Sequence, residues 1–334
     1  MRTSLRRPLA ALAVVVTAAA LTGCSSAASD EPDESVGGST DASAAWPRTI
    51  THELGETTLD AQPENVVSTS LTLTGTLLAI GAPVTASAAT SPSGSADENG
   101  FFTQWADVAV ERGVEVLYPN LELDLEAVVA ADPDLIVVST TGADSTADAY
   151  DELSDIAPTI ALDYSDKSWQ DLAAELGVAT GLEDQAAQTV ADFEQAVADT
   201  KDAITVPEGT TNAVVFNGGG NDTAFAKPQG SHGLLLSELG FDVVGADEAL
   251  DTSESPRTDF AFVSLENTVQ ALTGETVFLV AGTEETKDAL LAEPVLANAP
   301  AVTSGAVYPL GDDSFRMDFY SASNVLASVQ GFFG

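Results

Sequence analysis

Side chains able to carry out covalent or metal chemistry are scarce in this chain. It has two His, His52 and His232, which lie far apart in sequence, and one Cys, Cys24. One Cys excludes an internal disulfide framework and a Cys-rich zinc site, and two distant His disfavour a His-based metal cluster. The chain contains no Gly-x-Ser-x-Gly motif. With only two His in the sequence, a catalytic Ser-His pair has few candidate bases. An exported hydrolase that uses carboxylates stays open as an alternative, because acidic residues are abundant.

The net charge of the chain limits the classes of partner that it can bind. Its 334 residues include 52 Asp and Glu but only 11 Lys and Arg, a formal net charge of −41. Such a surface repels phosphates, so we expect no nucleic-acid partner. With 44% hydrophobic residues, the chain can bury a core, and its length fits one large domain or two of ordinary size.

The N-terminus has the pattern of an export signal. Three arginines precede the apolar run 9–21, which is too short to span a bilayer as a stable helix. The run ends in Leu21-Thr22-Gly23-Cys24, which resembles the cleavage box of bacterial lipoproteins, where the Cys is acylated after cutting. We predict a signal peptide over 1–23 and a lipidated Cys24; an ordinary signal peptide with an incidental Cys is the alternative. Cleavage leaves 8 bases against 52 acids, a formal charge of −44.

Residues 24–45 have the composition of a flexible tether. They are rich in Ser, Ala, Asp, Glu and Gly, and cannot bury enough apolar surface to offset the entropy of ordering. No later segment has an apolar run long enough to cross a membrane. We therefore expect a protein on the outer face of the cell membrane, attached through lipid alone.

Apolar runs bounded by turn residues alternate with helical patterns along the rest of the chain. This alternation predicts an α/β fold with mainly parallel sheets, arranged as two Rossmann-like lobes over 46–181 and 205–334. The expected strands are residues 65–68, 84–87, 135–139, 159–162, 212–216, 242–244, 276–281 and 306–309. The expected helices are residues 72–80, 124–131, 232–239 and 283–291.

A single long helix is predicted between the lobes, over 182–204. Apolar residues recur there at helical spacing, and the segment contains no Gly or Pro. At 1.5 Å per residue its length is about 34 Å, enough to join the lobes as a strut. The alternative is a helix packed wholly on one lobe.

Two α/β lobes would leave a cleft at the carboxyl ends of their strands, where ligands of open α/β sheets bind. The loops at this position are residues 68–70, 100–105, 140–142, 217–222 and 312–320. The glycines at 218–220 lack a following Gly-Lys-Ser/Thr, so we interpret them as a turn rather than a phosphate cradle.

Four segments of the chain carry a resemblance to a known family. The chain resembles the ferric enterobactin-binding proteins of bacterial siderophore importers from about Val66 to its C-terminus, with the motifs in the same order. The matching segments are Val66–Ser70, Gly100-Phe101 with Gln104-Trp105, Asp166–Trp169 and Phe315–Ala322. The resemblance implies a solute-binding protein of the helical-backbone class, which delivers a ferric siderophore to an ABC permease dimer. It implies no catalysis and no cofactor, because the siderophore itself holds the iron.

The resemblance places Arg316 in the ligand site, flanked by Phe315 and Tyr320. A ferric tris-catecholate is a trianion, so a strongly acidic protein that binds it must place its few cations at the ligand. A guanidinium can donate to catecholate oxygens while neighbouring rings stack on the catechols. The alternative is a structural Arg316 paired with Asp312, Asp313 or Asp318.

The remaining site residues implied by the resemblance are less specific. Phe225 stands where the enterobactin binder carries a cleft Trp, and Trp105 is either a ligand contact or part of the core. Thr103 stands where the enterobactin binder has an Arg, which removes a cation. Either the pocket accepts a less negative siderophore, or Lys227, Arg257 or Lys167 compensates from a neighbouring loop. Tyr118 is a further cleft-edge candidate, and His232 is either a helix-start residue or an axial haem ligand.

The expected partners follow from the same resemblance. They are a ferric siderophore, most simply a catecholate such as ferric enterobactin, and the permease; we expect a monomer. Gly75 and Leu234 stand where many relatives carry permease-docking glutamates, so docking residues cannot be carried over. The same fold binding haem, cobalamin or a hydroxamate siderophore is the alternative ligand class.

Overall fold

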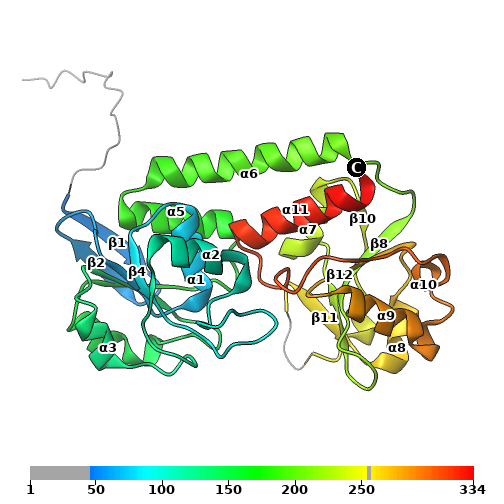
Figure 1. The fold of residues 1–334 in the computed structure, drawn as a ribbon, viewed down its shortest axis with the longest axis horizontal. Coiled ribbons are helices and arrows are strands. Elements are labelled where there is room, and N and C mark those ends of the chain that lie inside the picture. Colours follow the sequence, from blue (N-terminus) through cyan, green and yellow to red (C-terminus); the bar gives the residue numbers. More distant parts are fainter. Residues whose placement is uncertain (1–45, 254–256) are drawn as a thin grey trace, which may run out of the picture. The chain divides into compact units, whose positions relative to one another are not determined.

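The computed structural model describes residues 46–253 and 257–334, and all of them belong to one unit of the structure. The predicted signal peptide, the tether and Cys24 lie outside the described residues. Two large sheets, each with helices packed against it, and a two-stranded hairpin make up the described fold (Figure 1). The predicted α/β architecture is confirmed.

The first sheet has five strands in the order β5-β4-β3-β6-β7, all paired in parallel. Its central strands are buried on both faces, which explains why they read as unbroken apolar runs. The strands are β3 (Val66–Ser68), β4 (Val84–Ser87), β5 (Glu115–Val116), β6 (Leu135–Ser139) and β7 (Thr159–Leu162). The helices of this part are α1 (Leu71–Ala79), α2 (Thr103–Arg112), α3 (Leu125–Ala130), α4 (Tyr150–Ser154) and α5 (Trp169–Thr180), with a 3-10 turn at Ala147–Ala149.

An antiparallel hairpin of β1 (Arg48–His52) and β2 (Gly55–Leu59), which the sequence patterns did not indicate, attaches to the edge of this sheet. The Thr57 hydroxyl donates to the Thr159 carbonyl over 2.6 Å, and the Glu53 amide donates to the Ala161 carbonyl over 3.0 Å. The hairpin therefore covers the outer side of β7.

The second sheet has six strands, in the order β11-β9-β8-β12-β13 with β10 beside β8. β9 runs antiparallel to both of its neighbours, so this sheet is mixed rather than fully parallel. The strands are β8 (Thr210–Val215), β9 (Thr223–Ala226), β10 (Asp242–Val243), β11 (Phe260–Val263), β12 (Thr276–Leu279) and β13 (Val307–Pro309). The helices are α7 (Ser231–Glu238), α8 (Leu265–Ala271), α9 (Glu284–Ala292), α10 (Pro300–Ser304) and α11 (Phe319–Phe333), with 3-10 turns at Glu248–Leu250 and Pro294–Leu296.

The long helix α6 (Glu183–Ala203) connects the last helix of the first sheet to the first strand of the second. It packs against α5 at one end and lies beside α11 (Figure 1). Three rings tie these helices together: Trp169 of α5 meets Phe193 of α6 edge to face at 5.1 Å, and both contact Phe319 of α11. Edge-to-face aromatic pairs each add roughly 0.5–1.5 kcal/mol beyond the area they bury.

Helix α11 follows the second sheet in sequence but packs on α1 and α2 of the first. Its N-cap is Asp318, whose carboxylate accepts from the Ser321 amide while the Ser321 hydroxyl accepts from the Asp318 amide. The space for this cap is made by Gly75 of α1: a Cβ there would lie 2.7 Å from Asp318 Oδ2 and 2.9 Å from Trp105 Cδ1. Both distances are below van der Waals contact, so no larger residue fits without movement of α11.

We predict that Gly75→Ala destabilises the protein by about 1–3 kcal/mol, the usual cost of overpacking a close-packed contact. Gly331→Ala is the matched control, since Gly331 lies in α11 with no atom within 4 Å of its would-be Cβ. The control should be neutral or gain up to about 1 kcal/mol from helix propensity. Chemical denaturation of the three proteins measures this, and equal stability of the two variants would contradict the packing argument.

Candidate functional site

Two cavities lie between the loops of the first sheet and those of the second, and they share Phe102, Phe315 and Arg316. The larger has a volume of about 660 Å³ and the smaller about 400 Å³. The larger is lined by Thr72, Thr76, Phe102, Thr141, Gly142, Ala143, Tyr164, Ser165, Asp166, Lys167, Trp169, Leu172, Ser231, His232, Arg257, Thr258, Asp259, Phe260, Phe315, Arg316, Met317 and Asp318. A volume of this size suits a small-molecule ligand.

Arg316 is exposed where the two cavities meet. Its guanidinium carbon lies 4.5 Å from the centre of the Phe102 ring and 6.0 Å from that of Phe315. Within residues 46–253 and 257–334, no carboxylate oxygen lies within 4.0 Å of its nitrogens. The alternative of a structural ion pair with a nearby Asp is therefore not observed. Aromatic faces hold this cation, and its N–H donors stay available to a ligand.

The segment that carries Arg316 is fixed by hydrogen bonds on both sides. His232 Nε2 donates to the Ser314 carbonyl over 2.7 Å, and the Ala281 amide donates to the Ser314 hydroxyl over 2.9 Å. On the other side, the Ser321 hydroxyl donates to the Arg316 carbonyl over 2.6 Å. Burial lowers the pKa of His232, although its contact with the Ser314 carbonyl acts in the opposite direction. A neutral His232 with its Nε2 so engaged supports the helix-start interpretation of this residue.

Aromatic surface faces the same space. Phe315 is 40% exposed and stacks on Phe260 with ring centres 5.7 Å apart and planes inclined by 19°. Trp169 lines the larger cavity, and Phe102 lines both. Flat rings beside a cation suit a ligand that carries planar anionic rings.

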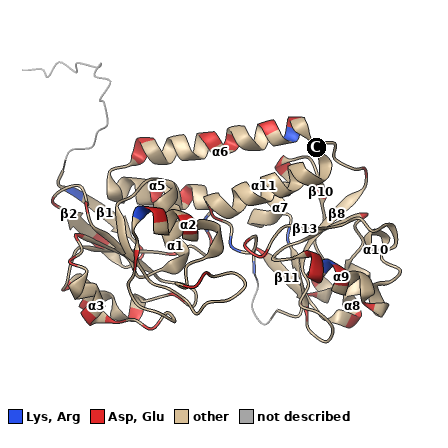
Figure 2. Ribbon diagram, viewed as in Figure 1, with Lys and Arg blue, Asp and Glu red and all other residues tan. Residues whose placement is uncertain are grey.

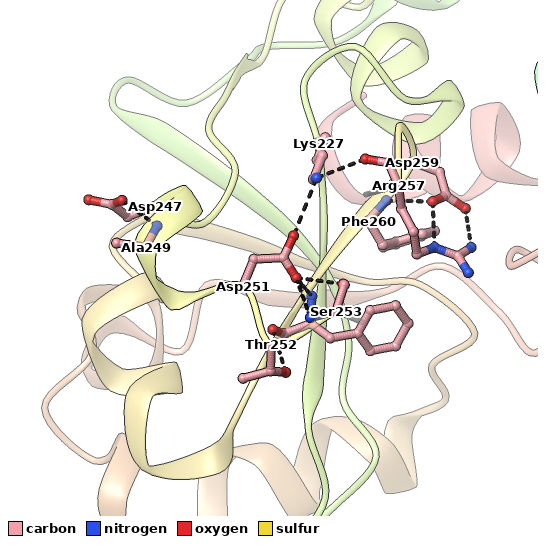
Figure 3. A network of polar contacts seen from close by, with 10 residues as sticks. Lys227, Asp247, Ala249, Asp251, Thr252, Ser253, Arg257, Asp259 and Phe260 are labelled. Carbon is pink, nitrogen blue, oxygen red and sulfur yellow. Dashed lines mark hydrogen bonds and ion pairs between the residues drawn. The ribbon is translucent and has the colours of Figure 1, made fainter. Parts of the chain in front are cut away.

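The other two cations of the larger cavity are paired with acids. Lys167 contacts Glu53 at 3.0 Å and Glu175 at 2.9 Å. Arg257 forms a two-pronged contact with Asp259, from Nε at 2.9 Å and Nη2 at 2.6 Å (Figure 3).

Lys227 lines neither cavity. Its ammonium group donates to the Arg257 carbonyl over 2.8 Å and contacts Asp251 at 3.4 Å, so it anchors the backbone beside Arg257 (Figure 3).

The charge balance of the larger cavity differs from that of the chain. Lys and Arg are few on the ribbon, whereas Asp and Glu occur on helices throughout (Figure 2). Yet the lining holds three cations, Lys167, Arg257 and Arg316, against three acids, Asp166, Asp259 and Asp318. The lining is therefore formally neutral in a chain whose net charge is −41, and Arg316 is the cation of this lining that forms no ion pair with a described acid.

Several residues expected at the ligand do not reach it. Phe225 is fully buried in β9, a strand covered on both faces, so the expected stacking of its ring on a ligand finds no support. Trp105 is also fully buried, between Phe101 and Phe102, and belongs to the core. Tyr118 is buried, with its hydroxyl donating to the Thr69 carbonyl. Tyr320 lines neither cavity.

Thr103 is exposed at the start of α2, directly after Phe102. Sequence reasoning placed residues 100–105 at the cleft without naming Phe102, and it missed Tyr164. Phe102 follows the quoted Gly100-Phe101 motif, and Tyr164 follows β7 by two residues, a loop position of the kind that carries ligand contacts. In the part of the chain that the structure describes, no group of three or more His, Cys, Asp or Glu side chains could hold a metal ion.

Comparisons with known proteins agree with this geometry. Residues 66–314 match the periplasmic binding protein family. The chain is 44% identical over 293 residues to the ferric enterobactin-binding periplasmic protein FepB of Escherichia coli O6:H1, covering 87% of this chain and 92% of that protein. It is 26% identical over 295 residues to the putative ABC transporter substrate-binding lipoprotein YhfQ of Bacillus subtilis, covering 84% and 87%.

Solved structures extend the comparison. The crystal structure of holo-ViuP matches with a TM-score of 0.79 and 42% identity, covering 87% of this chain and 96% of that one. Staphylococcus aureus SirA complexed with staphyloferrin B matches with a TM-score of 0.64 and 19% identity, covering 85% and 97%. The second match is a likeness of fold alone.

The cap residue Asp318 lies at the larger cavity and is almost fully buried. Burial raises its pKa from 3.8 to about 6, against opposing hydrogen bonds from Ser321 and Gln104. Because the folded state holds this proton more tightly than the unfolded chain, the contribution of Asp318 to the free energy of unfolding is largest below about pH 4 and is lost as the pH rises through about 6.

We predict that Asp318→Asn removes this dependence. From pH 4 to pH 7.5, the unfolding free energy of Asp318→Asn minus that of the wild type should rise by about 3 kcal/mol, because only the wild type loses stability as Asp318 ionises. Denaturant unfolding of both proteins across this range measures the difference, in which the titration of all other groups cancels. Parallel curves would show that Asp318 has an ordinary pKa in the folded protein.

Proposed function

We propose that this chain, which belongs to the periplasmic binding protein family, captures a ferric siderophore outside the cytoplasm and delivers it to an ABC permease. Its resemblance to the ferric enterobactin-binding proteins is confirmed by the 44% identity to the Escherichia coli protein. The chain is accordingly a binding protein rather than an enzyme.

The observation that carries the proposal is the guanidinium of Arg316, which lies beside aromatic rings at the larger cavity and has no acidic partner among the described residues. Arg316 offers unpaired donors there, beside the exposed ring of Phe315. A ferric tris-catecholate presents three negative charges and three planar rings, so it complements both features. A hydroxamate, haem or cobalamin lacks this combination of charge and shape, and these ligands form the alternative.

Binding of this kind needs no covalent step. The siderophore holds the iron as cargo, and the protein contributes Arg316, the ring of Phe315 and a cavity partly closed to water. Charge-assisted hydrogen bonds from a preformed guanidinium lose little entropy on binding. Since α6 and the Trp169–Phe193–Phe319 contacts join the two sheets, we propose a modest closure around the ligand rather than a wide hinge.

The organisation of the chain is proposed on the same basis. Residues 46–181 and 205–334 act as two lobes joined by 182–204, and the protein works as a monomer. Gly75 is buried, so it could not present a docking group, whereas Leu234 is 52% exposed on α7. The residues that contact the permease differ from those of glutamate-docking relatives.

Attachment to the membrane is proposed to rest on the N-terminus. Residues 1–23 would be removed as a signal peptide, Cys24 would carry the lipid, and 24–45 would form the tether. None of the helices in the described ranges is sufficiently long and apolar to cross a bilayer. The YhfQ relative of Bacillus subtilis is itself described as a lipoprotein.

We predict that the chain binds ferric enterobactin in preference to ferric hydroxamates and haem, and that Arg316→Ala weakens this binding by about 1.5–3 kcal/mol, the range for a hydrogen bond to a charged group. Quenching of tryptophan fluorescence measures the affinity, since Trp169 lines the larger cavity. Lys201→Ala removes one positive charge from α6, outside both cavities, and should leave the affinity unchanged. Equal losses in both variants, or tighter binding of haem, would contradict the proposal.

A second prediction concerns the anchor. In a bacterial host, Cys24→Ser should shift the protein from the membrane fraction to the soluble extracytoplasmic fraction, because a serine cannot accept the thioether-linked lipid. Immunoblotting of the fractions and the mass of the purified N-terminus measure this. An unlipidated wild-type Cys24 would support the ordinary signal peptide instead.

A further inference from the structure

The exposed ring of Phe315 stacks on a second, buried ring. Phe315 lines both cavities and is 40% exposed, whereas Phe260 lines the larger cavity and is only 2% exposed. Their ring centres lie 5.7 Å apart and their planes are inclined by 19°. Aromatic pairs favour such stacks, with ring centres about 4.5–7 Å apart. Phe260 therefore packs against the ring that borders both cavities.

Phe260 has a fixed place in the second sheet. It is the first residue of β11 and pairs with Ala226 of β9. Its amide donates to Asp259 Oδ1 over 2.8 Å, and the Asp259 carbonyl accepts from the Lys227 amide over 2.8 Å. Strand pairing and these two hydrogen bonds hold the backbone at Phe260. The position of its ring is therefore set by the sheet rather than by a loop.

His232 contacts both parts of this stack from the start of α7. Its ring centre lies 5.3 Å from that of Phe260. Its Nε2 donates over 2.7 Å to the carbonyl of Ser314, the residue directly before Phe315. His232 is itself only 6% exposed. One buried side chain therefore packs on the ring of Phe260 and holds the backbone that carries Phe315.

These contacts fix the exposed part of the Phe315 ring before a ligand arrives. A phenylalanine at the edge of a cavity can rotate about two side-chain bonds, and ordering it on binding costs part of the binding free energy. Stacking on Phe260 restricts this rotation in the free protein. Since aromatic rings attract one another over a limited set of distances and angles, the inclination of Phe315 also decides how a planar ring of the ligand can lie against it.

We propose that Phe260 is a positioning residue for Phe315: it holds that ring at the inclination at which a catecholate ring of the siderophore stacks on it. The ligand contacts Phe315, and Phe260 acts through this contact by keeping the ring in place. The pair thereby favours siderophores that carry planar aromatic rings over those that carry none. The inference rests on the proposed function, because it assigns Phe260 a role in siderophore binding through Phe315.

A double-mutant cycle on the full chain tests the coupling, with ferric enterobactin as the probe. Phe260→Leu keeps an apolar side chain but removes the flat face, and should weaken binding by about 3- to 10-fold, the effect of losing one aromatic pair. In a Phe315→Ala background, the same change should have little further effect, because the ring that it positions is gone. If Phe260→Leu does not fold, Phe260→Met takes its place, since a flexible methionine fills the same space without a flat face.

Phe278→Leu is the matched control. Phe278 is a fully buried ring of β12 in the same sheet, it contacts Phe241, Tyr308 and Phe333, and it lines neither cavity. Its replacement should lower the stability of the fold, as the loss of a core ring does, but leave the affinity for ferric enterobactin unchanged. A loss of affinity equal to that of Phe260→Leu would contradict the inference, because packing of the second sheet alone would then explain both.

A measurement without ligand separates this inference from the proposed function. With ¹³C-labelled phenylalanine, NMR relaxation of the ligand-free protein should show a more mobile Phe315 ring in Phe260→Leu, but not in Phe278→Leu. If no ferric siderophore binds the wild type, the proposed function fails while the mobility of Phe315 still decides the positioning role. Equal fold losses from Phe260→Leu in both Phe315 backgrounds, or an unchanged mobility of the Phe315 ring, would overturn the inference.

Discussion

The main constraint on this structure is that a strongly acidic protein must keep the guanidinium of Arg316 away from carboxylates, so that it can bind an anionic ligand. With 52 acids in the chain, an exposed arginine is more readily neutralised than left available. Arg316 avoids this because its neighbours are rings: the centre of the Phe102 ring lies 4.5 Å from the guanidinium carbon, and that of the Phe315 ring lies 6.0 Å away. An aromatic face attracts a cation without using its N–H donors. Two of the nearby carboxylates are engaged by other groups, Asp313 by Asn324 and Asp318 by the cap of α11.

The fold holds Arg316 and the neighbouring rings of Phe102 and Phe315 between the two large sheets. Arg316 lies on a short segment that leaves the second sheet and enters α11, and α11 packs on helices of the first. Gln104 of α2 donates to Asp318 Oδ2 over 3.2 Å, which links the cap of α11 to the part of the chain that supplies Phe102. Loss of the cap or of the glycine that admits it would displace the cation from the ring. The aromatic contacts of Trp169, Phe193 and Phe319 keep the supporting helices together.

The sequence predicts the strands better than the site. Leu135–Ser139 and Val84–Ser87 were expected with these bounds, because buried parallel strands are unbroken apolar runs. β9 was missed, since its four residues follow a glycine-rich turn and show no alternation. Helix α2 was missed because its N-cap, Phe102, provides no side-chain signal. Helix α11 was missed: its first two residues belong to the segment 312–320 treated as a loop, and no element was predicted after it, although the capping pair Asp318–Ser321 is readable in the sequence.

The site residues likewise differ in how well the sequence predicts them. Arg316 and Phe315 could be placed by resemblance, but the contact of Arg316 with Phe102 joins residues 214 positions apart, which no local pattern encodes. Phe225 was expected at the ligand but is buried in β9. The sequence of a short strand does not tell whether its ring faces the core or a ligand, because that depends on whether both faces of the sheet are covered. A crystal structure of the protein with ferric enterobactin would show whether Arg316 binds the ligand. We expect the iron complex in the cavity of about 660 Å³, with a catecholate oxygen within hydrogen-bonding distance of the Arg316 guanidinium. A ligand bound elsewhere, or an Arg316 paired with a carboxylate in the complex, would contradict this expectation.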